Sequence, residues 1–133
     1  MQYAALPYRL RNGVEVLLIT SRDTGRWVLP KGWPIKGKKP HVSAAREALE
    51  EAGIKGKVGK NAIGSYRYGK RLSRGMLACT VEVYPMVVER QMSHWPEQGQ
   101  RTLTWFSAED AAGLVEEAEL AVLLRAFASE MNR

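Results

Sequence analysis

The chain has 133 residues, which is enough for one hydrophobic core and too short for two ordinary domains, so we predict a single domain over residues 1–133. Its composition, 45% hydrophobic and 26% charged, excludes a disordered chain, and no apolar run approaches the roughly 20 residues of a membrane span. Twenty Lys and Arg against fourteen Asp and Glu give a net charge of +6, which favours anionic partners such as polyphosphates or nucleic acid.

The N-terminal residues lack the basic flank and continuous apolar stretch of a secretory signal, so we expect a cytoplasmic protein. Cys79 is the only cysteine, which excludes an internal disulfide and a cysteine-based zinc site. Its apolar neighbours predict that it lies in a buried strand.

The first half of the chain combines alternating strand patterns with one helical pattern. The Asn12-Gly13 turn signal joins two of the strands into a hairpin. In chain order we predict strands at 3–10, 14–20 and 27–29, a loop at 30–39, and a helix that begins near Pro40 or His41 and ends at Gly53.

The second half predicts more strands and a terminal helix. The strands cover 58–66, 76–88 and 102–106, with a polar loop at 89–101. Ser107 and Asp110 match a helix-capping pattern, and the buried stripe of the helix beyond it comprises Leu120, Leu123, Leu124 and Phe127. The predicted fold is therefore α+β, an α/β/α sandwich around a mixed, largely antiparallel sheet.

The helix at 40–52 carries the most informative pattern. Apolar residues recur at three- and four-residue intervals and predict an inward face of Val42, Ala45, Leu49 and Ala52. On this assignment Glu47, Glu50 and Glu51 share one exposed arc. Three neighbouring carboxylates repel one another unless a cation lies among them, and hard oxygen ligands suit Mg²⁺ or Mn²⁺. The alternative is a solvated acidic face in which Arg46 pairs with Glu50.

The surrounding residues resemble a Nudix box. Gly32 is followed, after thirteen residues, by Arg46-Glu-Ala-Leu-Glu-Glu-Ala-Gly-Ile54, and the 23-position spacing matches throughout. The preceding Trp27-Val-Leu-Pro-Lys-Gly32 and Trp105 also look like family features. Two positions depart from the pattern, because Lys38 stands where the family has its first glutamate and Ala48 where it has a larger aliphatic residue.

The resemblance implies a hydrolase with a Nudix fold. Glu47, Glu50 and Glu51 would hold Mg²⁺, with Mn²⁺ as an alternative, Arg46 would orient the carboxylates, and a metal-activated water would attack phosphorus. Catalytic roles would fall on Arg46, Glu47 and Glu97, the last as a further metal ligand or general base from its loop. Glu82 is a second choice for that role.

Within the family the chain looks most like the diphosphoinositol polyphosphate phosphohydrolases and their bacterial relatives, whose activity resembles that of diadenosine polyphosphate hydrolases. The resemblance leaves the head group open between inositol and a nucleotide. A substrate with many phosphates needs several cations, whereas adenine prefers an aromatic platform such as Tyr66, Tyr68 or Trp95. We expect substrate contacts from Arg22, Lys31, Gly32, Lys38, Arg67 and Arg101, with Lys70 and Arg71 as further available cations.

A non-catalytic Nudix-fold module that binds a nucleotide or RNA is the alternative, which Lys38 and the basic loops favour. The intact glutamates weigh against it, so we expect a small phosphorylated substrate as the partner and neither nucleic acid nor a membrane. The sequence leaves monomer and homodimer open.

Overall fold

The first two strands form the predicted hairpin. In the computed structural model, which describes residues 1–132, β1 (Gln2–Leu10) and β2 (Val14–Thr20) pair antiparallel. Asn12 (φ 53°) and Gly13 (φ 108°) make the turn in the left-handed region that asparagine and glycine tolerate best.

One mixed sheet contains the eight strands of the described residues. Beyond the hairpin they are β3 (Trp27–Val28), β4 (Lys31–Gly32), β5 (Ile54–Val58), β6 (Gly64–Leu72), β7 (Gly75–Gln91) and β8 (Leu103–Ser107). β1 runs parallel to β7, and the other pairs are antiparallel. The prediction of a mixed, largely antiparallel sheet is confirmed.

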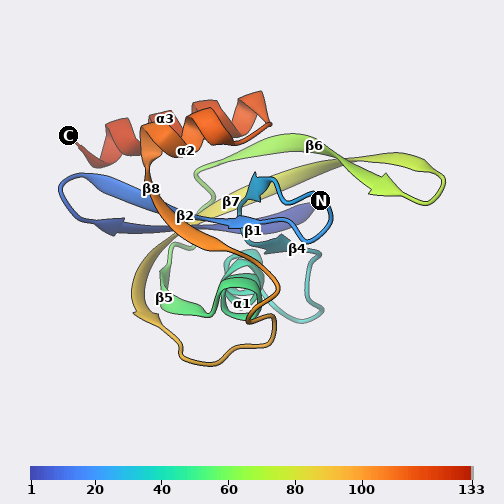
Figure 1. Ribbon diagram of the computed structural model, residues 1–133, viewed down its shortest axis with the longest axis horizontal. Helices are drawn as coiled ribbons and strands as arrows, with labels where there is room; N and C mark the ends of the chain where they lie inside the picture. Colours follow the sequence, from blue (N-terminus) through green and yellow to red (C-terminus); the bar gives the residue numbers. More distant parts are fainter. Residues whose placement is uncertain (133) are drawn as a thin grey trace.

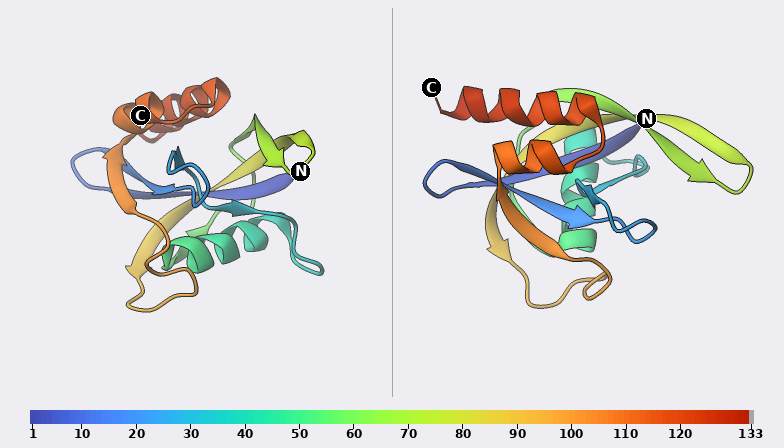
Figure 2. Two further views of the ribbon diagram at one scale, coloured as in Figure 1. Left: turned by 45° about the vertical axis from the view of Figure 1, so that its right-hand side comes forward. Right: turned by 45° about the horizontal axis from the view of Figure 1, so that its top comes forward.

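Helices cover both faces of this sheet (Figure 1). α1 (Pro40–Ala52) lies on one face, and α2 (Ala108–Leu114) and α3 (Ala118–Met131) lie on the other (Figure 2). β2 serves both cores, because alternate side chains of a strand point to opposite faces. Leu17 and Ile19 pack in the core beneath α1, whereas Val16 and Leu18 pack in the core beneath α2 and α3. The predicted sandwich is confirmed.

The C-terminal region contains the predicted cap and buried stripe. The Ser107 Oγ accepts a hydrogen bond of 3.1 Å from the Asp110 backbone N–H at the start of α2. Leu120, Leu124 and Phe127 are buried on α3, so the predicted stripe is confirmed. The predicted terminal helix is two helices, because the chain leaves helical geometry between α2 and α3.

The predicted strand at 58–66 is wrong. Val58 is the last residue of β5, and residues 64–66 belong to β6. Residues 59–63 connect the two strands. β5 begins at Ile54, directly after α1, and pairs with the far end of β7, whereas β6 pairs with the near end. A Cβ on Gly56 would lie 1.9 Å from the Val87 carbonyl oxygen, so the β5–β7 approach requires glycine.

The predicted inward face of α1 is correct at Ala52 and wrong at Val42, Ala45 and Leu49, none of which is buried. The buried stripe runs through Ala44, Ala48 and Ala52, whereas Val42 is 38% exposed. Small side chains at four-residue spacing let the helix lie close to the sheet. This rotation brings Glu51, 7% exposed, onto the buried side, so the carboxylates do not share one exposed arc.

Among the helices of residues 1–132, none combines the length and the apolar character that crossing a membrane requires.

Candidate active site

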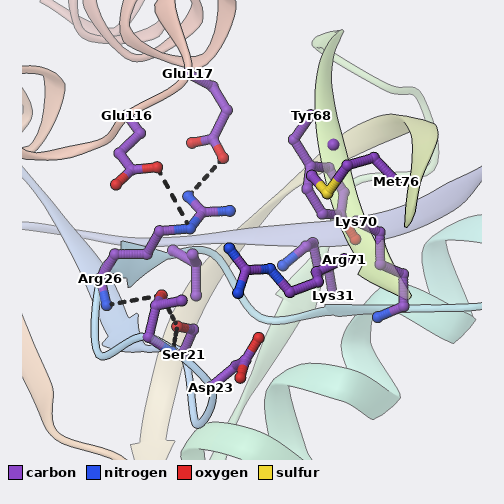
Figure 3. A pocket seen from close by; sticks show the side chains of 13 residues that line it. Ser21, Asp23, Arg26, Lys31, Tyr68, Lys70, Arg71, Met76, Glu116 and Glu117 are labelled. Carbon is purple, nitrogen blue, oxygen red and sulfur yellow. Dashed lines mark hydrogen bonds and ion pairs between the residues drawn. The ribbon is translucent and has the colours of Figure 1, made fainter. Parts of the chain in front are cut away.

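A cleft runs from α1 at one end to the β6–β7 hairpin at the other. It has two adjoining compartments of about 530 and 600 Å³. We name the first the carboxylate compartment, because its lining includes Glu47, Glu51 and Glu97, and the second the hairpin compartment, because its lining includes Lys70, Arg71 and Met76 (Figure 3). The residues that line both are Ser21, Asp23, Val28, Lys31, Tyr68 and Lys70.

Glu47 and Glu51 lie one helical turn apart on α1 and face β4. Gly32 of β4 makes this approach possible, because a Cβ there would lie 2.4 Å from the Glu47 carboxyl carbon. The Lys31 backbone N–H donates to Glu51 Oε1 at 3.4 Å. β4 therefore holds the Glu51 carboxyl group by a hydrogen bond and leaves room for that of Glu47.

Burial changes the protonation of this pair. It raises the pKa of Glu51 to about 8, and the hydrogen bond with Glu47 and the negative charges of Glu47 and Glu97 act in the same direction. The nearby Arg101 opposes the shift. Burial also raises the pKa of Glu47. In the metal-free protein the two groups therefore share a proton at neutral pH.

Glu97 reaches the pair from the loop between β7 and β8, which is attached to the end of α1. The Glu97 backbone N–H donates to the Glu50 carbonyl oxygen at 3.0 Å, and the Met92 N–H donates to the Gly53 carbonyl oxygen at 2.7 Å. Trp95 packs on Gly53, where a Cβ would lie 2.2 Å from the indole ring. Gly53, in the left-handed conformation (φ 68°), thus ends α1 and provides the surface on which the loop that carries Glu97 packs.

Arg101 connects the acidic residues at the floor of the carboxylate compartment. Its side chain is 10% exposed, and Nε lies 3.0 Å from Glu97 Oε1 while Nη2 lies 3.8 Å from Glu51 Oε1. Nη1 also donates to the Thr20 carbonyl oxygen at 3.1 Å. With these partners Arg101 offsets the acidic charge and holds the loop in place.

Lys31 lies where the two compartments meet. Its Nζ is 4.9 Å from the centre of the Tyr68 ring. Burial lowers the pKa of Lys31 to about 8, although the charge of Glu51 acts in the opposite direction. Tyr68 is itself held by a hydrogen bond of 2.6 Å from its hydroxyl to Gln2 Oε1.

The cleft collects most of the site residues predicted from the sequence. Those that line the carboxylate compartment are Arg22, Lys31, Gly32, Glu47, Glu51, Glu97 and Arg101. Glu82, the second choice for the additional acid, instead accepts a hydrogen bond from the Tyr84 hydroxyl.

Four predicted site residues do not line either compartment. Arg46 and Glu50 pair with each other on the outer side of α1, at 3.2 Å. Arg67 forms two side-chain hydrogen bonds with Glu119 of α3. Lys38 is exposed in the turn before α1. Arg67 and Lys38 therefore lie outside both compartments, and a substrate contact from either stays a prediction.

Other cleft residues were missed. Arg26, Glu116 and Glu117 line the hairpin compartment but come from segments with no motif, so sequence spacing could not bring them together. The suggestion of Tyr66 as an aromatic platform is wrong, because this side chain is 2% exposed.

The donor set of the carboxylate compartment suits a hard divalent cation. Glu47, Glu51 and Glu97 influence one another electrostatically, and all three supply carboxylate oxygens. Within residues 1–132, no three His, Cys, Asp or Glu side chains form a preassembled metal cluster. Glu97 is engaged by Arg101 and Glu50 by Arg46. A cation would therefore compete with a proton and with an arginine for these oxygens.

Known proteins similar to this chain share one family. The NUDIX domain matches residues 2–127. Nudix hydrolase 21, chloroplastic, of Arabidopsis thaliana is 31% identical over 92% of this chain. Diphosphoinositol polyphosphate phosphohydrolase 2 of Rattus norvegicus is 33% identical over 85% of it. The chain spans 63% and 61% of the lengths of these two relatives.

A solved structure shares the fold over nearly the whole chain. The crystal structure of Caenorhabditis elegans Ap4A hydrolase superposes with a TM-score of 0.70, at 23% sequence identity, over 98% of this chain and 96% of that one.

Proposed function

The chain belongs to the Nudix family, and from this membership we propose that it is a Mg²⁺-dependent hydrolase that cuts a phosphoanhydride bond. The substrate we propose is a diphosphoinositol polyphosphate or a dinucleoside polyphosphate. The observation that carries the proposal is the partly buried group of Glu47, Glu51 and Glu97 at one end of a cleft whose walls supply Arg22, Lys31, Lys70 and Arg71.

Three carboxylates gathered in a partly buried position are unfavourable without a cation. Burial raises the pKa of Glu51 to about 8, so in the metal-free protein a proton reduces the repulsion. Glu47, Glu51 and Glu97 would hold Mg²⁺, with Mn²⁺ as the alternative ion. When bound, the metal supplies Lewis-acid activation of water and offsets the charge on phosphorus.

The chain's own residues position the substrate around this end of the cleft. Lys31, at the junction of the two compartments, meets the phosphate chain with its ammonium group. The exposed Arg22 lies 3.8 Å from Glu97 and provides a second cation at the mouth. Arg101 has carboxylate and carbonyl partners of its own, so we assign it to positioning Glu51 and Glu97 and not to binding phosphate.

In the proposed site, Glu50 and Arg46 bind neither the metal nor the substrate. Their ion pair on the outer side of α1 keeps the Glu50 carboxylate directed away from the cleft. Glu50 still contributes through its backbone, because its carbonyl oxygen accepts from the Glu97 N–H.

The proposal is tested with a substrate panel. Diphosphoinositol polyphosphate, diadenosine tetraphosphate, nucleoside triphosphate and ADP-ribose are each incubated with the protein and Mg²⁺, Mn²⁺ or a chelator, and the products are separated. We expect metal-dependent cleavage of the first or second substrate. Binding of nucleotide or RNA without cleavage of any substrate would instead favour the non-catalytic module.

A further inference from the structure

Arg26 lines the hairpin compartment, and two glutamates neutralise its charge. Its Nη1 lies 2.6 Å from Glu117 Oε2, and its Nε lies 3.7 Å from Glu116 Oε2. Figure 3 shows both glutamates pointing toward the guanidinium, with Tyr68 and Lys70 across the pocket. Two carboxylates on one guanidinium leave excess negative charge at this wall.

Helix capping does not account for Glu117. It is the N-cap residue of α3, but its side chain makes no capping hydrogen bond. Its side chain is 8% exposed, and its Oε1 has no hydrogen-bond partner among the described residues. The pair with Arg26 therefore leaves one carboxylate oxygen uncompensated.

The hairpin compartment consequently has mixed charge. Its remaining cations are Lys31, Lys70 and Arg71, and Asp23 also lines it. Met76 and the half-buried Tyr68 add less polar surface. A ring with a phosphate on nearly every oxygen directs negative charge at every wall of the compartment that holds it, so each wall should carry cations. The hairpin compartment offers an acidic wall.

On the basis of the proposed function, we propose that Glu116 and Glu117 select the substrate head group. The phosphate chain crosses Lys31 from the carboxylate compartment, and the hairpin compartment takes the head group beyond it. The acidic wall repels a polyphosphorylated ring and admits a nucleoside, which is uncharged and offers hydroxyl and amino donors. The head group selected is therefore the nucleoside of a dinucleoside polyphosphate.

Glu116→Lys is the sharpest test, because it reverses the exposed charge of the wall while leaving the shorter Arg26–Glu117 pair in place. Glu116 is 70% exposed, so the substitution should not unfold the protein. Glu109→Lys is the matched control. Glu109 is 73% exposed, pairs with Arg125 and does not line either compartment of the cleft. Both variants change the net charge equally.

Steady-state kinetics are measured on diphosphoinositol pentakisphosphate and diadenosine tetraphosphate at one ionic strength. We expect Glu116→Lys to lower KM for the inositol substrate by about fivefold and to change KM for the dinucleotide by less than about twofold. Glu109→Lys should change neither. Equal effects on the two substrates, or equal effects of the two variants, would overturn the proposal.

A binding measurement separates this inference from the proposed function. Calorimetry with inositol hexakisphosphate and with adenosine monophosphate needs no turnover. Selective tightening of inositol hexakisphosphate binding in Glu116→Lys supports the acidic wall even if no substrate is cut, in which case only the proposed activity fails. Unchanged binding of both probes in Glu116→Lys would contradict the selection itself.

Discussion

Gly32 is the residue whose missing side chain matters most directly for the cleft. A Cβ at this position would lie 2.4 Å from the Glu47 carboxyl carbon and 2.6 Å from Oε1. A carboxylate is the flexible end of its side chain, so Glu47 can move while the strand stays in place. The family pattern has glycine here, and the contact with Glu47 gives the physical reason.

We predict that Gly32→Ala lowers kcat/KM by about a hundredfold while changing the free energy of unfolding by less than about 1 kcal/mol. Gly113→Ala is the control, because a Cβ there meets nothing within 4 Å. Activity assays and urea unfolding of the two variants check the prediction. Wild-type activity in Gly32→Ala would mean that the position of the Glu47 carboxylate is unimportant.

Glu51 makes the stability of the metal-free protein depend on pH. Burial raises its pKa from 4.5 to about 8, so the folded state binds a proton that the unfolded state releases between these values. The contribution of Glu51 to stability is complete below the unfolded pKa and is lost as pH rises through the folded one. Lys31, with its pKa lowered to about 8, changes protonation above this window.

We therefore predict that, with a chelator present, the free energy of unfolding falls between pH 5 and 7.5 and that Glu51→Gln flattens this dependence. Urea unfolding at several pH values measures it. A wild-type protein whose stability rises with pH over this range would contradict the burial of a protonated Glu51.

Lys38 is the residue at which this sequence departs most from the family pattern. The sequence predicts a substrate contact from Lys38, which is exposed in a turn where its backbone N–H donates to the Ile35 carbonyl oxygen. Because Lys38 lies outside both compartments, we predict that Lys38→Glu changes KM for either substrate by less than about twofold and leaves the Mg²⁺ response unchanged. A KM raised selectively for the many-phosphate substrate would show that Lys38 does contact a substrate phosphate.

At the scale of secondary-structure elements, the ends of α1 could be predicted and its rotation could not. Pro40 and Gly53 have local roles, as a first-turn residue and a left-handed cap, that the sequence alone specifies. The buried face depends on the sheet below, where alanines fit, Glu47 faces Gly32 and Glu51 faces Arg101. β5 was missed because its five residues include two lysines and a central glycine, although Lys55 and Lys57 alternate with the less exposed Ile54, Gly56 and Val58.

The junction between α1 and the β7–β8 loop depends on Gly53. Gly53→Ala places a side chain at a φ of 68° and pushes against Trp95, whereas Gly37→Ala has the same conformational strain at φ 78° with nothing within 4 Å. We predict destabilisation of about 1 kcal/mol for Gly37→Ala and about 3 kcal/mol for Gly53→Ala. Only Gly53→Ala should also reduce activity, through displacement of Glu97. Urea unfolding and kinetics measure both effects, and equal losses in the two variants would exclude a role for the Trp95 contact.

At the scale of the whole molecule, the cleft joins segments that are distant in the sequence. The carboxylate compartment was foreseeable in part, because one motif contains Gly32, Glu47 and Glu51. The hairpin compartment could not be foreseen. The partners of Arg26 are Glu116 and Glu117, which follow it by 90 and 91 positions, and no spacing rule selects residues so far apart. The same limit applies to Arg67, whose pairing with Glu119 of α3 no spacing rule indicates.

The most direct measurement is the hydrolysis rate of the best substrate of the panel as a function of Mg²⁺ concentration, for the wild-type protein and Glu51→Gln. The amide is similar in size to the carboxylic acid and keeps an uncharged group in the buried position, so the variant should remain folded. We predict that the wild-type rate rises from near zero in chelator to saturation, and that the variant is slower by at least about a hundredfold at saturating Mg²⁺. A full wild-type rate in chelator, or equal rates for the two proteins, would contradict a catalytic metal site at these glutamates.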